Sequence, residues 1–325
     1  MCSISKLKSP GLCFDMNSKQ RYFCLNFITA FYAFYKIVAK NKRNNIGIII
    51  HIHNMSIIPY IFFLRLLDVK LVLNIHNSLV NFNFLQYNLL KLGLPFFDAI
   101  ISVSNSVGDE VIRTFPSIKQ KAHSIPNGIH IDQLMKVNDL RSYNTKKNID
   151  VIVVARLVKQ KNVPKVLSVI SECKNLKKVV WYGQGDEMIM ARSKVEKGAL
   201  ASVLEFKGIK PRQEVLEAIN KSIIYLSLSK WEGLGVANLE ALSLPTEVVL
   251  SDIPPHRELL SNNNLKLVDL ETSDKEIAAI IDSKIVEYKQ RGGFLLARSA
   301  TTRVRYDLRL LVGKYIDVYN ELINN

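Results

Sequence analysis

The stretch Ser229–Glu240 holds two glutamates and two glycines at a spacing suited to a polar ligand. It follows a predicted strand and opens a predicted helix, with Gly233 and Gly235 at the entrance. A helix N-terminus presents free N–H groups and a positive dipole end, which suit an anion such as a diphosphate. Glu240 would lie roughly 7–8 Å along that helix, so Glu232 and Glu240 could hold hydroxyl groups at opposite ends of one ligand. Solvated carboxylates at a helix start are the alternative interpretation.

Two further loops carry residues that could contact phosphate. Arg156 and Lys161 follow the predicted strand 151–154. Basic residues just beyond the carboxyl end of a parallel strand point into the crevice where such sheets bind ligands, so the pair predicts a phosphate clamp. Exposed basic residues without a ligand are the alternative. Gly183 and Gly185 form a Gly-x-Gly turn that lacks the third glycine of a dinucleotide fingerprint, and they also fit a tight strand-to-helix turn.

The elements that position these loops are short β-branched runs alternating with helical patterns, which is typical of parallel sheets. The polar stretch 138–148 predicts a linker between two doubly wound domains, with the boundary near residue 145. Helical spacing of apolar residues from Val304 to Leu322 predicts one long terminal helix. The predicted strands are 46–50, 70–74, 99–103, 121–125, 151–154, 179–182, 223–228 and 247–250.

Composition limits the class of protein. The 325 residues are 48% hydrophobic and 22% charged, which excludes disordered, collagenous and disulfide-scaffold proteins. The four cysteines form no Cys-x-x-Cys pair, so we expect a reducing cytoplasm and no structural zinc. Residues 1–148 hold 18 basic and 7 acidic side chains, within a net charge of +15. This excess of positive charge attracts nucleic acid, anionic lipid or phosphorylated substrates, or it serves solubility alone.

One aromatic segment near the start raises the question of a membrane. The charge-free segment 22–35 is followed by Lys36, Lys40, Lys42 and Arg43. It could lie on a membrane surface as a basic amphipathic helix, or pack as an ordinary core helix. No small-residue cleavage site follows it, so we expect no signal peptide.

Four motifs, taken in their order along the chain, resemble glycosyltransferase family 4, and the resemblance extends from about residue 45 onward. The motifs are Arg156/Lys161, Gly183/Gly185, Glu232/Glu240 and the segment 251–258 (Ser-Asp-Ile-Pro-Pro-His-Arg-Glu). The family consists of retaining transferases with the GT-B fold, in which two Rossmann-like domains face a cleft. The resemblance implies an acceptor-side domain at 1–145, a nucleotide-sugar donor domain at 146–303 and a helix at 304–325 that crosses back. Four segments of the first half are similar to the family's acceptor domain: 50–54, 73–77, 98–104 and 125–128.

The resemblance also implies roles for single residues of the donor site. Arg156 and Lys161 would neutralise the donor diphosphate, aided by backbone N–H groups near Gly235. Glu232 would bind hydroxyl groups of the donor sugar, and Glu240 would bind the ribose.

The remaining implied roles concern the nucleobase and the reaction centre. The turn at Gly183 and Gly185 would border the nucleotide, and the backbone near Ile209 would meet the base. As isolated residues, the histidines of the first half fit ordinary strand ends, but the family pattern directs His76 towards the sugar.

The expected chemistry follows from charge. Breaking the anomeric bond leaves negative charge on the nucleoside diphosphate, so fixed cations aimed at the phosphates lower the barrier. No nucleophile is evident, and the resemblance therefore implies front-face displacement with retention, the leaving phosphate accepting the acceptor's proton. The chain has no Asp-x-Asp, so we expect neither a divalent metal nor a further cofactor.

Three departures from the family pattern are visible. About 45 residues precede the His-x-His strand without a Gly-rich loop, so we expect a shortened N-terminal domain and question its activity. His130 stands where an aspartate usually follows Asn-Gly-Ile, and 244–247 replaces the usual Gly-x-Pro turn. Neither of the last two should abolish donor binding.

The expected function is transfer of a hexosyl unit from a UDP- or GDP-sugar to a lipid-linked saccharide, in O-antigen (lipopolysaccharide) or capsule-type polysaccharide assembly. The protein would be cytoplasmic, with peripheral binding to the inner leaflet as an option. A non-catalytic nucleotide-binding or partner protein of this fold is the main alternative. A nucleic-acid binder and an NAD-dependent enzyme are weaker alternatives, because RRM, KH, helix-turn-helix and three-glycine patterns are missing from the sequence.

Overall fold

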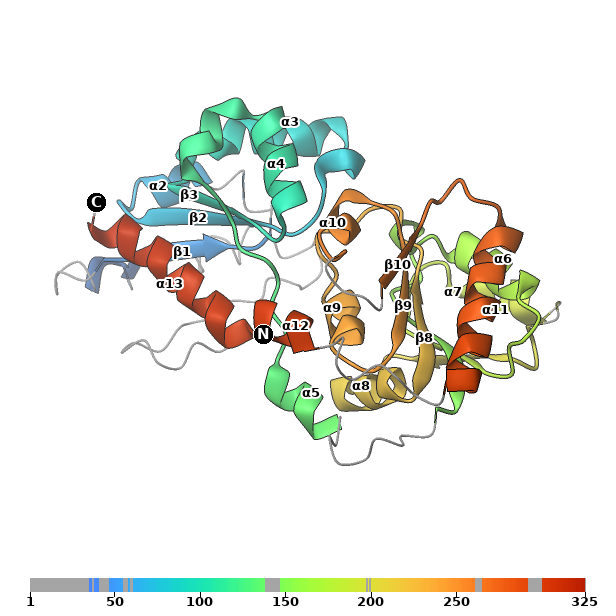
Figure 1. Ribbon diagram of the computed structural model, residues 1–325. Helices are drawn as coiled ribbons and strands as arrows, with labels where there is room; N and C mark the ends of the chain where they lie inside the picture. Colours follow the sequence, from blue (N-terminus) through green and yellow to red (C-terminus); the bar gives the residue numbers. More distant parts are fainter. Residues whose placement is uncertain are drawn as a thin grey trace.

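The computed structural model describes residues 35–36, 38–40, 47–54, 58, 61–137, 147–196, 198, 200–260, 265–291 and 300–324. Within this part the chain forms two α/β domains, each built on a parallel sheet (Figure 1). Most of the aromatic segment 22–35, the shortened start of the first domain and the proposed boundary near residue 145 lie outside the described residues. The predictions about them stay predictions.

The first domain has a four-stranded sheet in the order β1-β2-β3-β4. Its elements are β1 (Ile49–Ile52), α2 (Ile61–Arg65), β2 (Lys70–Ile75), η3 (Leu79–Asn81), α3 (Phe84–Gly93), η4 (Leu94–Phe96), β3 (Ala99–Ser102), α4 (Asn105–Thr114), η5 (Pro116–Lys121) and β4 (Ala122–Ser124). Helix α5 (Ile131–Val137) then leads towards the second domain.

The second domain has a six-stranded sheet in the order β10-β9-β8-β5-β6-β7. Its elements are β5 (Ile149–Val154), η6 (Lys159–Lys161), α6 (Val163–Glu172), β6 (Val179–Tyr182), α7 (Met188–Glu196), β7 (Leu204–Gly208), α8 (Arg212–Asn220), β8 (Ser222–Ser227), α9 (Val236–Leu242), β9 (Glu247–Ser251), α10 (Pro254–Arg257), β10 (Leu265–Val268) and α11 (Asp274–Arg291). Two C-terminal helices follow, α12 (Ala300–Arg305) and α13 (Leu308–Asn324).

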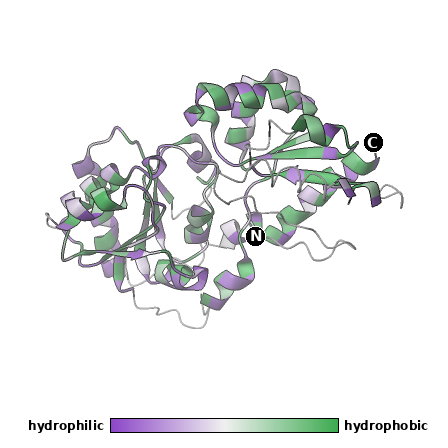
Figure 2. Ribbon diagram, turned by 180° about the vertical axis from the view of Figure 1, so that it is seen from behind, coloured by the Kyte–Doolittle hydropathy of each residue, from purple (hydrophilic) through white to green (hydrophobic). Residues whose placement is uncertain are grey.

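Alternating side chains of β2 explain why helices cover both faces of the first sheet. Leu71 and Leu73 point to one face, where α3 and α4 pack, while Val72 points to the other, where Leu311 and Val318 of α13 pack. The long helix α13 therefore lies along the face opposite α3 and α4 (Figure 1). Figure 2 shows apolar residues in green along the strands of this sheet, as expected when both faces are buried.

The second sheet follows the same rule with more helices. One face packs against α6, α7 and α11, and the other packs against α8 and α9. β7 and β10 are missing from the predicted strands because they form the two edges of this sheet and carry exposed charges, Glu205 and Lys266. Short half-buried edge strands lack the continuous apolar run of the central strands.

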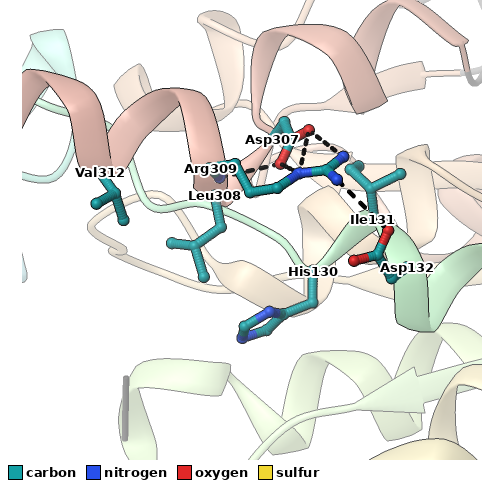
Figure 3. A pocket seen from close by; sticks show the side chains of 7 residues that line it. All are labelled: His130, Ile131, Asp132, Asp307, Leu308, Arg309 and Val312. Carbon is teal, nitrogen blue, oxygen red and sulfur yellow. Dashed lines mark hydrogen bonds and ion pairs between the residues drawn. The ribbon is translucent and has the colours of Figure 1, made fainter. Parts of the chain in front are cut away.

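The chain passes between the domains twice, and the two passages touch. The N–H of Ile129 donates to the carbonyl of Tyr306 at 2.8 Å, and the N–H of Leu308 donates to the carbonyl of Ile129 at 3.0 Å. Arg309 pairs with Asp307 at 2.8 Å and reaches Asp132 of α5 at 3.7 Å (Figure 3). A shallow pocket lies beside these groups.

This crossover corrects the prediction of one terminal helix from Val304. The structure has α12 and α13, interrupted at Tyr306–Asp307. The backbone there hydrogen-bonds to Ile129 instead of continuing the helix, and the Tyr306 ring is buried in the core of the second domain. Helical periodicity could not detect the interruption, because Ile129, which forms an isolated β-bridge with Asp307, is 178 residues away.

Candidate functional site

The candidate site lies where the strand order of the second sheet reverses. β5 continues to β6 and β7 on one side, while its other neighbour, β8, continues to β9 and β10. Loops that leave the carboxyl ends of the two central strands at such a switch point border a crevice. The loop after β5 holds Arg156 and Lys161, and the loop after β8 is 228–235. Two of the sequence motifs therefore meet at the switch point.

Arg156 and Lys161 differ in their surroundings. Arg156 is exposed, and its side chain forms no hydrogen bond or ion pair with the part of the chain that the structure describes. Lys161 is partly buried at the end of η6 and forms an ion pair with Glu232. One cation of the predicted clamp is thus open to solvent, and the other is already held by a carboxylate.

Gly183 and Gly185 support the Arg156 loop from behind. A Cβ at Gly183 would overlap the carbonyl of Ala155, and one at Gly185 would overlap the carbonyl of Leu157. Gly183 also has φ of 137°, which side chains rarely adopt. The two glycines are therefore required for the backbone packing that places Arg156, and this supports the tight-turn interpretation of their pattern.

Glu232 is a buried carboxylate with several partners. Its side chain is 6% exposed, it pairs with Lys161, and it accepts a hydrogen bond from Ser229 Oγ at 2.8 Å. Gln160 Nε2 lies 3.4 Å from its second oxygen and donates to the carbonyl of Trp231 at 2.9 Å. Buried carboxylates require such partners, so the position of Glu232 is fixed by both loops.

The Glu232 loop also meets the first domain. A Cβ at Gly233 would overlap the carbonyl of His76, which follows β2. The N–H of Ser78 donates to the carbonyl of Glu232 at 3.4 Å. Residues from the two halves of the sequence, His76 and Glu232, are therefore neighbours across the domain boundary.

A buried polar network lies behind the Glu232 loop. Tyr225 Oη donates to Asn238 Oδ1 at 2.9 Å, and Asn238 Nδ2 donates to His256 Nε2 at 3.0 Å. His256 Nδ1 then donates to the carbonyl of Ser251 at 2.8 Å, and Ser251 Oγ donates to the carbonyl of Ser229 at 2.6 Å. Burial lowers the pKa of His256, which keeps the ring neutral as this pattern requires.

Glu240 lies on α9 at the other end of the motif. Its side chain is 7% exposed and forms an ion pair with Arg212 of α8. Burial raises the pKa of this carboxyl to about 6, and the Arg212 guanidinium opposes the shift. Gly235, immediately before α9, has φ of 66°, and a Cβ there would crowd Asn238.

Ile209 follows β7 and is 75% exposed, three residues before Arg212. The N–H of Gly183 donates to the carbonyl of Gly208 at 2.8 Å, which joins this loop to the Gly183 turn. The structure thus links the Ile209 loop to Gly183 on one side and, through Arg212, to Glu240 on the other.

Three histidines of the first domain gather where β1 and β2 end. His53 Nδ1 lies 3.0 Å from His76 Nε2, and His51 Nδ1 lies 2.6 Å from Tyr319 Oη of α13. Burial lowers the pKa of His51 to about 3, and the pKa values of His53 and His76 are lowered by the same cause. The cluster is therefore neutral near pH 7. Across the described residues, no group of three His, Cys, Asp or Glu side chains could hold a metal ion.

Sequence reasoning gave no role to four residues that the structure places around the site. Gln160 and Asn238 lie within the motifs, but the sequence predicts no role for either. His256 belongs to the motif 251–258, which likewise predicts no separate role for it. Glu258 accepts hydrogen bonds from the N–H groups of Ser106 at 2.6 Å and Asn105 at 3.1 Å, at the start of α4. The spacing of one sequence cannot reveal the contacts of Gln160 and Glu258, because their partners lie more than 70 residues away along the chain.

Comparison with protein families matches both domains. A model described as glycosyl transferases group 1 matches residues 137–291, and one described as Glycosyltransferase Family 4 matches residues 17–133. Together the two matches identify the chain as a glycosyltransferase of the family 4 type.

Curated relatives match parts of the chain. The alpha-maltose-1-phosphate synthase of Mycolicibacterium smegmatis is 24% identical over 210 residues, which are 58% of this chain and 54% of that protein. The GDP-mannose:cellobiosyl-diphosphopolyprenol alpha-mannosyltransferase of Xanthomonas oryzae pv. oryzae is 33% identical over 116 residues, 35% of this chain and 30% of that protein. The chain spans about half the length, or less, of these curated relatives.

Solved structures confirm the predicted fold. The crystal structure of Anabaena HepE in complex with UDP and glucose superposes with a TM-score of 0.73 at 15% identity, covering 93% of this chain and 84% of that one. Together with the two parallel sheets, this likeness establishes the GT-B fold for this family member. Among the helices that the structure describes, none is both long and apolar enough to cross a membrane.

Proposed function

We propose that the protein transfers a hexosyl unit from a UDP- or GDP-sugar to a lipid-linked saccharide, with retention at the anomeric carbon, in O-antigen or capsule-type polysaccharide assembly. Family membership supports the transfer. The Xanthomonas relative, named for a GDP-mannose donor and a diphosphopolyprenol-linked acceptor, supports the donor and acceptor classes.

The observation that carries this proposal is the position of Glu232. Its buried carboxylate pairs with Lys161, from the loop after β5, and the backbone of Glu232 and Gly233 contacts the loop that begins at His76 of the first domain. A donor whose diphosphate contacts Arg156 and Lys161 would present its sugar to this carboxylate and its anomeric carbon towards His76.

The chemistry uses groups of this chain that are already oriented. The bond between the anomeric carbon and the diphosphate oxygen breaks, and the acceptor hydroxyl oxygen forms the new bond on the same face. The acceptor's proton passes to the leaving phosphate oxygen. Arg156 and Lys161 stabilise the charge that develops on the leaving group, which is where fixed cations lower a barrier most.

Glu240 and the Ile209 backbone complete the donor site in this proposal. Glu240 would accept hydrogen bonds from ribose hydroxyls, most strongly in its ionised form, and the exposed backbone near Ile209 would meet the base. The turn at Gly183 and Gly185 borders the nucleotide. The site needs no divalent metal, because Arg156 and Lys161 supply the positive charge.

The first experiment is a thermal-shift panel on the intact chain with UDP, GDP, ADP, CMP and NAD. A ligand that binds only the folded state raises the melting temperature by mass action. We expect UDP or GDP to give the largest shift, which would also name the donor base. A response to none of the nucleotides would overturn the proposal.

Transfer itself is tested with Glu232→Ala. The variant should lose transfer to an extracted lipid-linked acceptor while the thermal shift with the nucleoside diphosphate stays close to that of the unaltered protein. Unchanged transfer would remove Glu232 from the site. Nucleotide binding without transfer by the unaltered protein, across UDP- and GDP-hexoses, would instead identify a non-catalytic binding protein.

A further inference from the structure

Helix α3 of the first domain exposes apolar side chains where a helix usually exposes polar ones. Its buried side, with Leu90, packs on the sheet, yet Phe84 is 86% exposed, Leu85 is 65% exposed and Leu92 is 70% exposed. Eight residues span a little more than two helical turns, so Phe84 and Leu92 lie two turns apart on the same outer side of the helix. The residue between them, Asn88, donates its side-chain N–H to the carbonyl of Phe84 at 2.7 Å within the helix.

The neighbouring helix α4 shows that this exposure is specific to α3. Both helices pack on the same face of the same sheet. The solvent-facing positions of α4, again four residues apart, are Asn105, Asp109 and Arg113. Sheet packing alone therefore does not explain apolar side chains on the outer side of α3. A large exposed apolar surface is uncommon on soluble proteins and marks an interaction site.

The charges around α3 indicate what kind of surface it meets. From residue 69 to 97 the chain has no Asp or Glu, and its only Lys or Arg side chains are Lys70 and Lys91. Lys91 is exposed on the last turn of α3. Lys121 donates to the carbonyls of Leu94 and Phe97, at 2.9 and 2.7 Å, and so holds the end of η5, with exposed Lys119, against η4.

The apolar surface extends in two directions from α3. At its C-terminal end, Phe96 of η4 contacts Phe62 of α2, with ring centroids 5.5 Å apart, and Phe62 is also exposed. At its N-terminal end, exposed Val80 of η3 is only four residues beyond His76 of the candidate site. This connection is fixed, because Glu110 of α4 accepts hydrogen bonds from Ser78 Oγ at 3.0 Å and from the N–H of Leu79 at 3.1 Å.

We propose that the surface formed by Phe62, Phe84, Leu85 and Leu92, which we name the α3 surface, docks on a phospholipid bilayer. Aromatic and aliphatic side chains enter the region between head groups and acyl chains, while Lys91 and Lys119 remain beside anionic head groups. The docking places the His76 side of the cleft next to the membrane. This inference rests on the proposed lipid-linked acceptor, whose lipid would remain in the bilayer while its saccharide enters the cleft.

The test is co-flotation of the full chain with vesicles of phosphatidylethanolamine and phosphatidylglycerol. The variant Phe84→Gln/Leu92→Gln removes two exposed side chains and keeps good helix formers. The matched control is Ile189→Gln, because Ile189 is 84% exposed in the first turn of α7 in the other domain. We expect the α3 variant to lose roughly tenfold or more in vesicle affinity, from the apolar area it no longer buries, and the control to bind like the unaltered protein.

Several outcomes would overturn the docking. They are failure of the unaltered protein to float, equal loss in the control, or binding that high salt abolishes while Phe84→Gln/Leu92→Gln leaves it unchanged. A dimer that this variant converts to a monomer would identify a second copy as the occupant. The thermal shift with UDP or GDP, measured on the same samples, separates this test from the proposed function, because the donor site lies in the other domain.

Discussion

The two sides of the candidate site, one from each domain, are built differently. On the side of the second domain, Glu232 is supported by a continuous buried network through Asn238 and His256. On the side of the first domain, His53 and His76 reach the surface and contact each other, and the His53 ring also lies 4.2 Å from the His51 ring. Beside them the buried atoms His51 Nε2 and Asn74 Oδ1 have no hydrogen-bond partner among the described residues.

This difference indicates how each domain would bind its own substrate. A satisfied buried network resists rearrangement, because breaking any of its hydrogen bonds leaves a desolvated polar atom. The second domain therefore presents a fixed surface, suited to a ligand with constant parts such as a nucleoside diphosphate. The first domain presents side chains that can change partners at little cost, which suits an acceptor that varies among family members.

The largest effect should come from the pair of cations. Replacing both Arg156 and Lys161 by Ala should weaken nucleoside diphosphate binding by roughly 3–6 kcal/mol, because two charge-assisted contacts are lost. Isothermal titration with the nucleotide that stabilises the protein measures this loss. The control is Lys159→Ala, which removes a cation from the same turn, η6. Unchanged affinity in the double variant would place the diphosphate elsewhere and remove the basis of the comparison.

The next prediction concerns the rigidity of the two sides. Asn238→Ala should lower the free energy of unfolding by about 2–4 kcal/mol, because Tyr225 Oη and His256 Nε2 lose their buried partner. His53→Ala, on the exposed side, should cost less than about 1 kcal/mol. Urea unfolding of both variants compares them directly. Equal losses would contradict the contrast between a fixed and an adaptable side.

Glu240 gives a pH-dependent test of the fixed side. Burial raises its pKa from 4.5 to about 6, so the folded state binds the proton more tightly than the unfolded state. This carboxyl therefore lowers stability progressively as pH rises from 4.5 to about 6, by up to about 2 kcal/mol, and the loss persists above that range.

Glu240→Gln should accordingly be more stable than the unaltered protein at pH 7 to 8, by about 1–2 kcal/mol, and the gain should disappear below pH 4.5. Thermal melts across this pH range measure it. If Glu240 also binds the ribose, the same variant should bind the nucleotide less well. A gain in stability without loss of affinity would leave Glu240 out of the site.

The smallest effect on stability and on nucleotide affinity should come from His76. His76→Ala should change the free energy of unfolding by no more than about 0.5 kcal/mol, since the side chain is exposed. Titration with UDP or GDP should give an affinity within about twofold of the unaltered protein, while transfer falls. Weakened nucleotide binding would assign His76 to the donor rather than to the acceptor side.

Much of the fold could be predicted from the sequence because central strands and amphipathic helices carry local signals. Eight of the ten described strands coincide with predicted β-branched runs to within a few residues, and the two that were missed, β7 and β10, are edge strands. The break between α12 and α13 was missed because its cause, the contact of Tyr306 and Asp307 with Ile129, is distant in the chain.

The order of motifs along the chain by itself determined the family and pointed to Arg156, Lys161, Glu232 and Glu240, because strand, loop and helix signals are local and parallel strands bring their carboxyl ends together. Only the tertiary structure decided that Lys161 pairs with Glu232, that His256 supports the loop from behind, and that α3 exposes an apolar side. Pairing and exposure depend on which distant segments approach each other, and one sequence records the residue types but not those approaches.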